Sequence, residues 1–214
     1  MNENLEMRRA SVVTALVALA VVLLAACGSS GSKGTSAPSP SATVRSYVGT
    51  AQGTGAFVSV VVDGSRALTY VCDGVPADPT GTPPTIQAWF NGPSDGGAVD
   101  VQQPAGRLQL QLTGSDMTGT LTLTDDRRLS VSGRMVDADA GLYRAETAGA
   151  EGKAVAGWIL APDGQQRGGV GVESGGITKI SGVRVLTLAQ PTFSAQGLAT
   201  ARIAKVGITP IPIP

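Results

Sequence analysis

The side chains of this sequence that could carry out chemistry are mainly cysteines and carboxylates, because the 214 residues include no histidine. This excludes the usual Ser-His-Asp and Cys-His nucleophile systems, histidine zinc ligands and the commonest general base near neutral pH. Cys72 ends a strand-like run beside Asp73, and nothing local to it would lower its pKa. We therefore expect a buried structural cysteine that shares one strand face with Leu68 and Tyr70.

Two groups of carboxylates could act in pairs in glycoside hydrolysis or bind calcium through their oxygens. Asp125-Asp126 is followed directly by two arginines, and Asp137-X-Asp139, considered together with Glu146, lacks the spacing of a calcium loop beyond its first two ligands. We expect both groups to lie in solvated turns. The sequence thus predicts no catalytic residue, no metal site and no cofactor.

Four large aromatic residues are weak candidates for ligand binding: Trp89, Phe90, Tyr143 and Trp158. Trp89 and Phe90 are adjacent, so on a strand they point to opposite faces. One of them could belong to the core while the other contributes to a ligand surface. Core packing is the expected role of most of the four.

Cys27 closes an N-terminal segment that is built like a secretory signal. Arg8-Arg9 precedes a 17-residue apolar run that ends in small residues, and a spanning helix usually needs about 20 residues. The stretch Leu24-Ala25-Ala26-Cys27 resembles the lipobox of bacterial lipoproteins. The resemblance implies a diacylglyceryl group on the Cys27 sulfur and cleavage between Ala26 and Cys27, which places the protein on the extracytoplasmic face of the cell membrane.

The same segment leaves alternatives open. It could be an uncleaved signal anchor with a chance cysteine, or Arg8-Arg9 could direct twin-arginine export. Met7 could be the true start of translation.

Composition separates the chain into four parts: a signal peptide at 1–26, a lipidated cysteine with a flexible Gly/Ser/Pro linker at 27–43, a folded domain at 44–208 and an extended Pro-rich tail at 209–214. The chain has 16 basic and 16 acidic residues, and the signal removes two of each. No basic block remains to follow a phosphate backbone, so nucleic-acid binding is not expected.

The folded part is rich in Val, Leu, Thr and Gly, and strand signals recur at short spacing. Asp63-Gly64 between two such runs predicts a hairpin, and in 107–114 three leucines alternate with polar residues. We expect an all-β fold, an antiparallel meander of about nine or ten strands that forms a barrel or a two-layer sandwich. The only helical candidate is 194–205. The strand signals cover 56–62, 67–73, 85–92, 97–103, 107–114, 119–124, 129–136, 140–146, 154–161, 168–174 and 177–188.

A second resemblance covers Ala56 to Gly164. The series GAFVSVVV, YVCDG, AWFNG, GLYRAE and GWILAPDG is similar to an uncharacterised β domain of exported actinobacterial proteins, with Ala161 where that pattern has Leu. The resemblance supports export and the domain boundaries and implies no activity.

Together these features predict a lipid-anchored cell-envelope protein whose non-catalytic all-β domain binds a partner protein or has a structural role. The first alternative is a barrel that carries a small apolar ligand, which needs an interior cavity of several hundred Å³. The second is a hydrolase that depends on carboxylates. The sequence indicates no oligomeric state.

Overall fold

A computed structural model describes residues 43–77, 81–150, 152–195 and 198–207. Within these ranges the chain forms fifteen β-strands and no helix, so the prediction of an all-β antiparallel fold is confirmed. Ala26 and Cys27, the rest of the signal and linker up to residue 42, and the tail from residue 208 lie outside the described residues. In the described part of the chain, no helix is long and apolar enough to cross a membrane.

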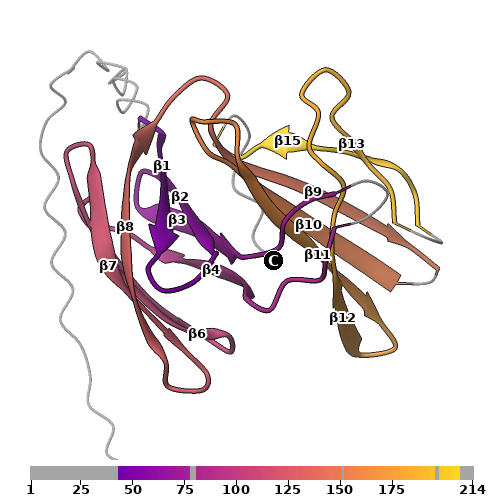
Figure 1. The fold of residues 1–214 in the computed structure, drawn as a ribbon, viewed down its shortest axis with the longest axis horizontal. Helices are drawn as coiled ribbons and strands as arrows, with labels where there is room; N and C mark the ends of the chain where they lie inside the picture. The colour runs from indigo at the N-terminus through magenta and orange to yellow at the C-terminus, as the bar shows by residue number, and fades with distance from the viewer. Residues whose placement is uncertain (1–42, 78–80, 151, 196–197, 208–214) are drawn as a thin grey trace, which may run out of the picture. The chain divides into compact units, whose positions relative to one another are not determined.

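Eight strands form the first sheet, sheet A, in the order β4-β3-β2-β1-β8-β7-β6-β5 (Figure 1). Every neighbouring pair is antiparallel, and β1 joins the two halves by pairing with both β2 and β8. A bridge between Ser94 and Val99 nearly closes the sheet into a barrel. The strands are β1 (Arg45–Ala51), β2 (Phe57–Asp63), β3 (Arg66–Cys72), β4 (Gln87–Pro93), β5 (Ala98–Gln103), β6 (Gly106–Thr113), β7 (Asp116–Leu123) and β8 (Arg128–Val136).

The interior of sheet A is filled by side chains that alternate along its strands. On β6, Leu108, Leu110 and Leu112 point inward and are buried, whereas Gln109 and Gln111 are exposed. Met117 and Leu121 of β7 pack against them with no solvent-accessible surface. A cavity that admits water would leave accessible surface on its lining residues, so these contacts describe a packed core.

The hairpin between β2 and β3 has the turn that the sequence predicts. Asp63 pairs with Arg66, which leaves Gly64 and Ser65 as a two-residue loop. Gly64 has φ of 60°, a left-handed conformation that favours glycine. The Asp-Gly pair therefore sets the register of two strands that run through the centre of the fold.

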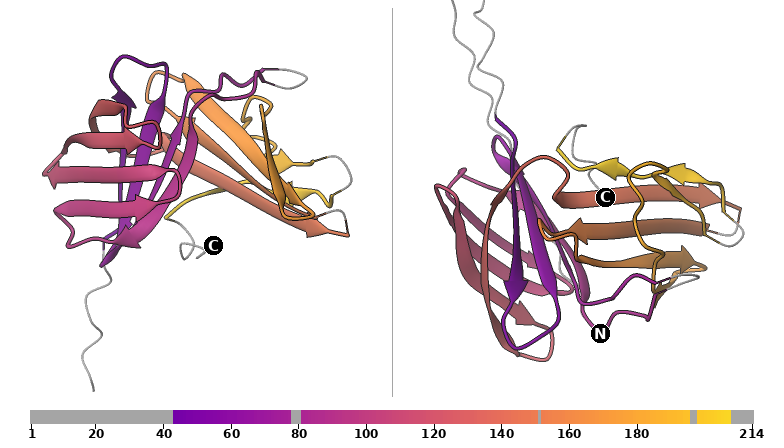
Figure 2. Two further views of the ribbon diagram at one scale, coloured as in Figure 1. Left: turned by 90° about the horizontal axis from the view of Figure 1, so that it is seen from below. Right: turned by 45° about the horizontal axis from the view of Figure 1, so that its top comes forward.

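The second sheet, sheet B, has the order β12-β11-β10-β9-β15, and Figure 2 shows its long strands side by side. One of its faces packs against the outer face of β1–β4, where Leu142 and Ile159 join a buried cluster with Leu68, Tyr70 and Cys72. The prediction that these last three residues share one buried face is confirmed. The strands of sheet B are β9 (Gly141–Gly149), β10 (Gly152–Leu160), β11 (Gln166–Ser174), β12 (Ile177–Ser181) and β15 (Ala204–Lys205). A separate two-stranded sheet pairs β13 (Thr192–Phe193) with β14 (Ala201–Arg202).

The C-terminal segment covers the opposite face of sheet B. Val183, Leu186, Phe193 and Ile203 pack there against a cluster that includes Trp158. The predicted helix at 194–205 is wrong, because the described residues of this stretch form turns and the short strands β14 and β15. The predicted strand at 177–188 ends at Ser181, since the following residues leave the sheet edge to cover its face.

Candidate binding face

The aromatic pair on β4 points to opposite sides of sheet A, as adjacent strand residues must. Phe90 is buried in the interior of sheet A. Trp89 lies between the sheets, where its ring stacks on Tyr70 with centroids 4.2 Å apart and the Arg144 guanidinium lies 4.6 Å from its centroid. Trp89 is thus half-buried between the two sheets rather than fully exposed.

The other two aromatic candidates belong to sheet B and are buried. Trp158 donates a hydrogen bond from Nε1 to the carbonyl oxygen of Arg184 at 2.9 Å, and its ring meets Phe193 edge-on. Tyr143 donates from its hydroxyl to the carbonyl oxygen of Asp139 at 2.6 Å. Burial raises the pKa of Tyr143, so the phenol stays neutral at ordinary pH. These contacts fix the fold of the C-terminal segment and of the β8–β9 turn.

Cys72 is fully buried on β3, and desolvation raises the pKa of its thiol. The next residue, Asp73, accepts hydrogen bonds from the backbone N–H groups of Thr85 and Ile86, both at 2.9 Å, and from the Thr85 hydroxyl. Its carboxylate therefore closes the loop between β3 and β4. The sequence did not predict this role, because it depends on the position of Thr85 and Ile86 beside the end of β3 in the folded chain.

The carboxylates that could have formed a catalytic or calcium site lie in separate places. Asp125 forms an ion pair with Arg127 in an exposed turn, and Glu146 forms one with Arg144 on β9. Asp137 and Asp139 are exposed in the β8–β9 turn. No group of three or more potential metal ligands occurs among the residues that the structure describes.

The outer face of β5–β8 is not covered by sheet B, and its side chains form regular polar rows across the strands. One row runs through Gln102, Arg107, Thr122 and Arg128, and the next through Asp100, Gln109, Thr120 and Ser130. Neighbouring strands are about 4.8 Å apart, so each row of four residues spans about 14 Å. The alternation that buries the leucines of β6 also aligns these polar side chains.

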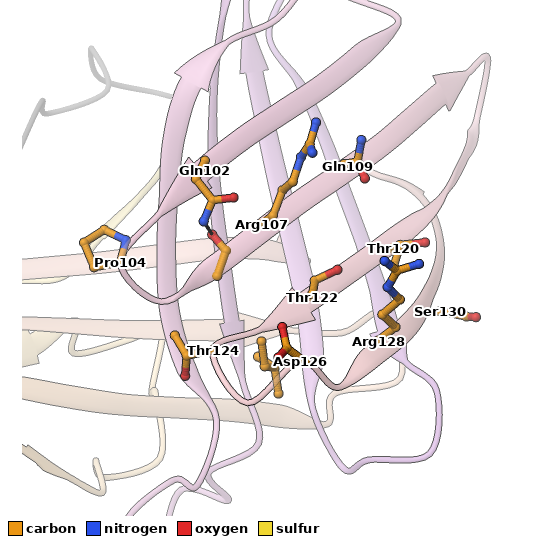
Figure 3. Close-up of a pocket in the computed structure, with 12 residues that line it drawn as sticks. Gln102, Pro104, Arg107, Gln109, Thr120, Thr122, Thr124, Asp126, Arg128 and Ser130 are labelled. Carbon is orange, nitrogen blue, oxygen red and sulfur yellow. Dashed lines mark hydrogen bonds between the residues drawn. The ribbon is translucent and has the colours of Figure 1, made fainter.

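This face is hollowed into a trough with a volume of about 610 Å³ (Figure 3). We use the term trough for the surface lined by the residues of both rows other than Asp100, together with residues of the turns at one end of the strands. Its lining is mainly hydroxyl, amide and guanidinium groups, with Asp126 as its one carboxylate among the described residues. The lining residues are Gln102, Pro104, Gly106, Arg107, Gln109, Thr120, Thr122, Leu123, Thr124, Asp126, Arg128 and Ser130.

The fold itself uses some of these polar groups and leaves others free. Asp100 accepts from Arg107 at 2.9 and 2.8 Å and from Gln109 at 3.2 Å. The hydrogen bond from Arg107 is the main cause that lowers the pKa of Asp100. By contrast, the Arg128 guanidinium and the hydroxyls of Thr120 and Thr122 have no hydrogen bond or ion pair within the described ranges.

A second hollow of about 580 Å³ lies around the β8–β9 turn. Met135 and Leu188 are exposed on its surface, and Asp137 and Asp139 lie at the turn. Lys205 donates a hydrogen bond to the carbonyl oxygen of Ala138 beside these carboxylates. This hollow has fewer free polar groups than the trough.

The hydroxyl, amide and guanidinium groups of the trough can form many hydrogen bonds to a ligand. Among the described lining residues Asp126 is the one carboxylate, whereas glycoside hydrolysis uses a pair of carboxylates. Comparison of the chain with protein-family models, curated proteins and solved structures gives no match. The argument for a function therefore rests on the residues themselves.

Proposed function

We propose that this protein is a lipid-anchored component of the bacterial cell envelope whose all-β domain binds an envelope component without chemical turnover. The binding site is the trough on the outer face of β5–β8. The observation that carries this proposal is the set of free polar groups on a regular face, which includes Thr120, Thr122 and Arg128. Exposed groups with no role inside the fold are available to a ligand.

The anchoring part of the proposal depends on the sequence Leu24-Ala25-Ala26-Cys27. Two long acyl chains bind a membrane firmly, since each buried CH2 contributes about 0.8 kcal/mol. The Gly/Ser/Pro stretch that follows has the composition of a flexible linker, which would let the domain reach components beyond the membrane surface.

The alternatives that involve an apolar ligand or a reaction have less support. A carrier would hold its ligand inside sheet A, but Leu108, Met117 and Leu121 fill this interior and have no accessible surface. A hydrolase would need two convergent carboxylates, whereas Asp126 is the one carboxylate among the described lining residues and Asp100 is paired with Arg107. Non-catalytic binding needs neither feature.

A blocking substitution tests the proposed site. Thr120→Tyr keeps a strand-forming residue at a half-buried outer position and fills the centre of the trough with a ring. Thr178→Tyr on β12 makes the same change on an exposed strand of sheet B and serves as the matched control.

The assay measures binding of the full chain, extracted in detergent, to delipidated cell envelopes of the producing bacterium. Binding by the wild type and the Thr178 variant, with at least a tenfold loss in the Thr120 variant, is the expected result. Equal binding by all three proteins, or binding by none, would overturn the proposal. Thermal melts of all three proteins establish that each one is folded.

A further inference from the structure

We propose that the ligand of the trough is a hydroxyl-rich glycan chain with a carboxylate-bearing sugar that Arg128 binds. The inference rests on the proposed function, because it assumes that the trough is the binding site. It adds the chemical class of the ligand and the residue that selects it.

The neutral groups of the trough match sugar hydroxyls. Threonine and serine hydroxyls donate and accept hydrogen bonds, and glutamine amides do both with separate atoms. Gln109, Thr120 and Ser130 lie in one row across three strands, and Thr122 follows in the next row. A sugar hydroxyl also donates and accepts hydrogen bonds, so a chain of sugars that lies along a row can form a hydrogen bond at every strand.

The dimensions favour an extended chain over a compact ligand. The two rows lie two residues apart along each strand, which is about 6.6 Å, whereas each row spans about 14 Å. The two rows, without the turn residues beyond them, therefore define a band that is about twice as long as it is wide. A linear oligosaccharide of a few rings fits such a surface better than a globular molecule does.

The charges of the trough favour a ligand with isolated acidic groups. Asp100 neutralises Arg107 through two hydrogen bonds, so this guanidinium is already occupied. Arg128 is exposed and has no ion pair among the described residues, and its planar guanidinium can bind a carboxylate through two parallel hydrogen bonds. Asp126 lies in the same trough and would repel a ligand that carries a negative charge on every unit.

Other ligand classes fit the lining less well. Among the described lining residues, Pro104 and Leu123 alone have sizeable apolar side chains and none has an aromatic ring, so the trough offers little to a lipid or an apolar peptide. One free arginine beside an aspartate does not make the basic surface that a nucleic acid needs. A glycan with occasional carboxylates matches the free hydroxyls and Arg128, the one free cation among the described lining residues.

The experiment uses the full chain in detergent and an array of neutral and uronic-acid-bearing oligosaccharides, followed by titration of the members it retains. The wild type is expected to bind uronic-acid-bearing members. Arg128→Gln should weaken this binding tenfold or more while changing the binding of neutral members less than twofold. Arg128→Lys should restore part of the affinity, because it keeps the charge but not the planar fork.

Arg134→Gln is the matched control, since Arg134 lies on the same strand and its only ion pair, to Asp116, is long at 3.8 Å and exposed. Retention of no uronic-acid-bearing member, or equal loss of affinity in the Arg128 and Arg134 variants, would overturn the inference. Protease treatment of the delipidated envelopes separates this failure from failure of the proposed function. Suppose that Thr120→Tyr blocks binding to the envelopes and that protease treatment of the envelopes also abolishes it. The trough then remains the binding site, and its partner is a protein.

Discussion

Replacing Cys72 by alanine is expected to lower the free energy of unfolding by about 1 kcal/mol. The thiol is fully buried in the layer between the two sheets, within the cluster that contains Leu68 and Ile159. The substitution removes one sulfur atom, and the lost transfer energy together with a small cavity at about 24 cal/mol per Å³ gives this magnitude. Cys72→Asp should cost several times more, because it buries a carboxylate without a partner.

The assay combines urea denaturation with the rate of modification by a thiol reagent. The native protein should react far more slowly than the unfolded chain, because the reagent needs an exposed thiolate and burial raises the pKa of Cys72. Modification of the native protein as fast as of the unfolded protein would refute the assignment of Cys72 to the core. Binding to cell envelopes should be the same in Cys72→Ala and wild type.

The raised pKa of Cys72 also predicts a pH dependence with a definite sign. An unfolded cysteine titrates near pH 8.5, and the folded thiol titrates above its own ordinary value. The contribution of the neutral, buried thiol to the free energy of unfolding is therefore complete below about pH 8. It is lost as the pH rises toward the pKa of the thiol in the folded protein. The wild type should lose more free energy of unfolding than Cys72→Ala between about pH 7.5 and pH 10, and equal losses would contradict this assignment. Tyr70, whose pKa is raised mainly by burial, contributes to both proteins.

Three further predictions concern the turn, the contact between the sheets and the anchor. Gly64→Val should lower the free energy of unfolding by about 1 kcal/mol or more, since Gly64 has φ of 60°; a melt that matches the wild type would contradict the turn. Gly157→Val should cost about 2 kcal/mol or more in urea denaturation, because a Cβ there would lie 2.6 Å from Cζ2 of Trp89 and 2.8 Å from Cε1 of Tyr70; an unchanged midpoint would show that the sheets can separate at little cost. Unfolded protein purified from membranes should titrate one thiol by a colorimetric reagent, because a lipidated Cys27 is a thioether, whereas two thiols and no diacylglyceryl mass would refute the anchor.

The sequence predicts most of sheet A because its strands are amphipathic. Leu108, Leu110 and Leu112 alternate with polar residues, and this pattern fixes the face that each side chain occupies. β1 was not predicted. Gly49 of β1 pairs with Gly133 of β8, where either Cβ would collide with the backbone of the other strand. Only the paired strands reveal why two glycines are needed there.

The C-terminal segment shows the limit of local patterns. Residues 194–205 contain good helix formers, but Ile203 and Val206 are buried against sheet B and the backbone follows its edge. Strands of two residues have no local signal, because a neighbouring strand defines them. The same reason explains why the segment after Ser181 covers a sheet face instead of extending β12.

The candidate site was visible in the sequence only as a solvent-exposed face. The alternation of polar and apolar residues placed Gln109 and Gln111 on the solvent-exposed side of their strand. It could not show that Thr120 and Ser130 lie in the same row as Gln109. Nor could the alternation show that Asp100 forms an ion pair with Arg107, whereas Arg128 forms none among the described residues. Register across four strands supplies this information, and register is a property of the folded sheet.

Methyl NMR of the threonine and methionine residues provides the most direct test that the trough is the binding face. The full chain in detergent is titrated with glycan oligosaccharides released enzymatically from the producing bacterium's envelope. The predicted result is a saturable shift of the Thr120 and Thr122 methyl signals, with Thr178 on β12 unchanged. Shifts confined to Thr178 or to the methyl group of Met135 at the second hollow, or no shift at any residue, would contradict the assignment of the trough.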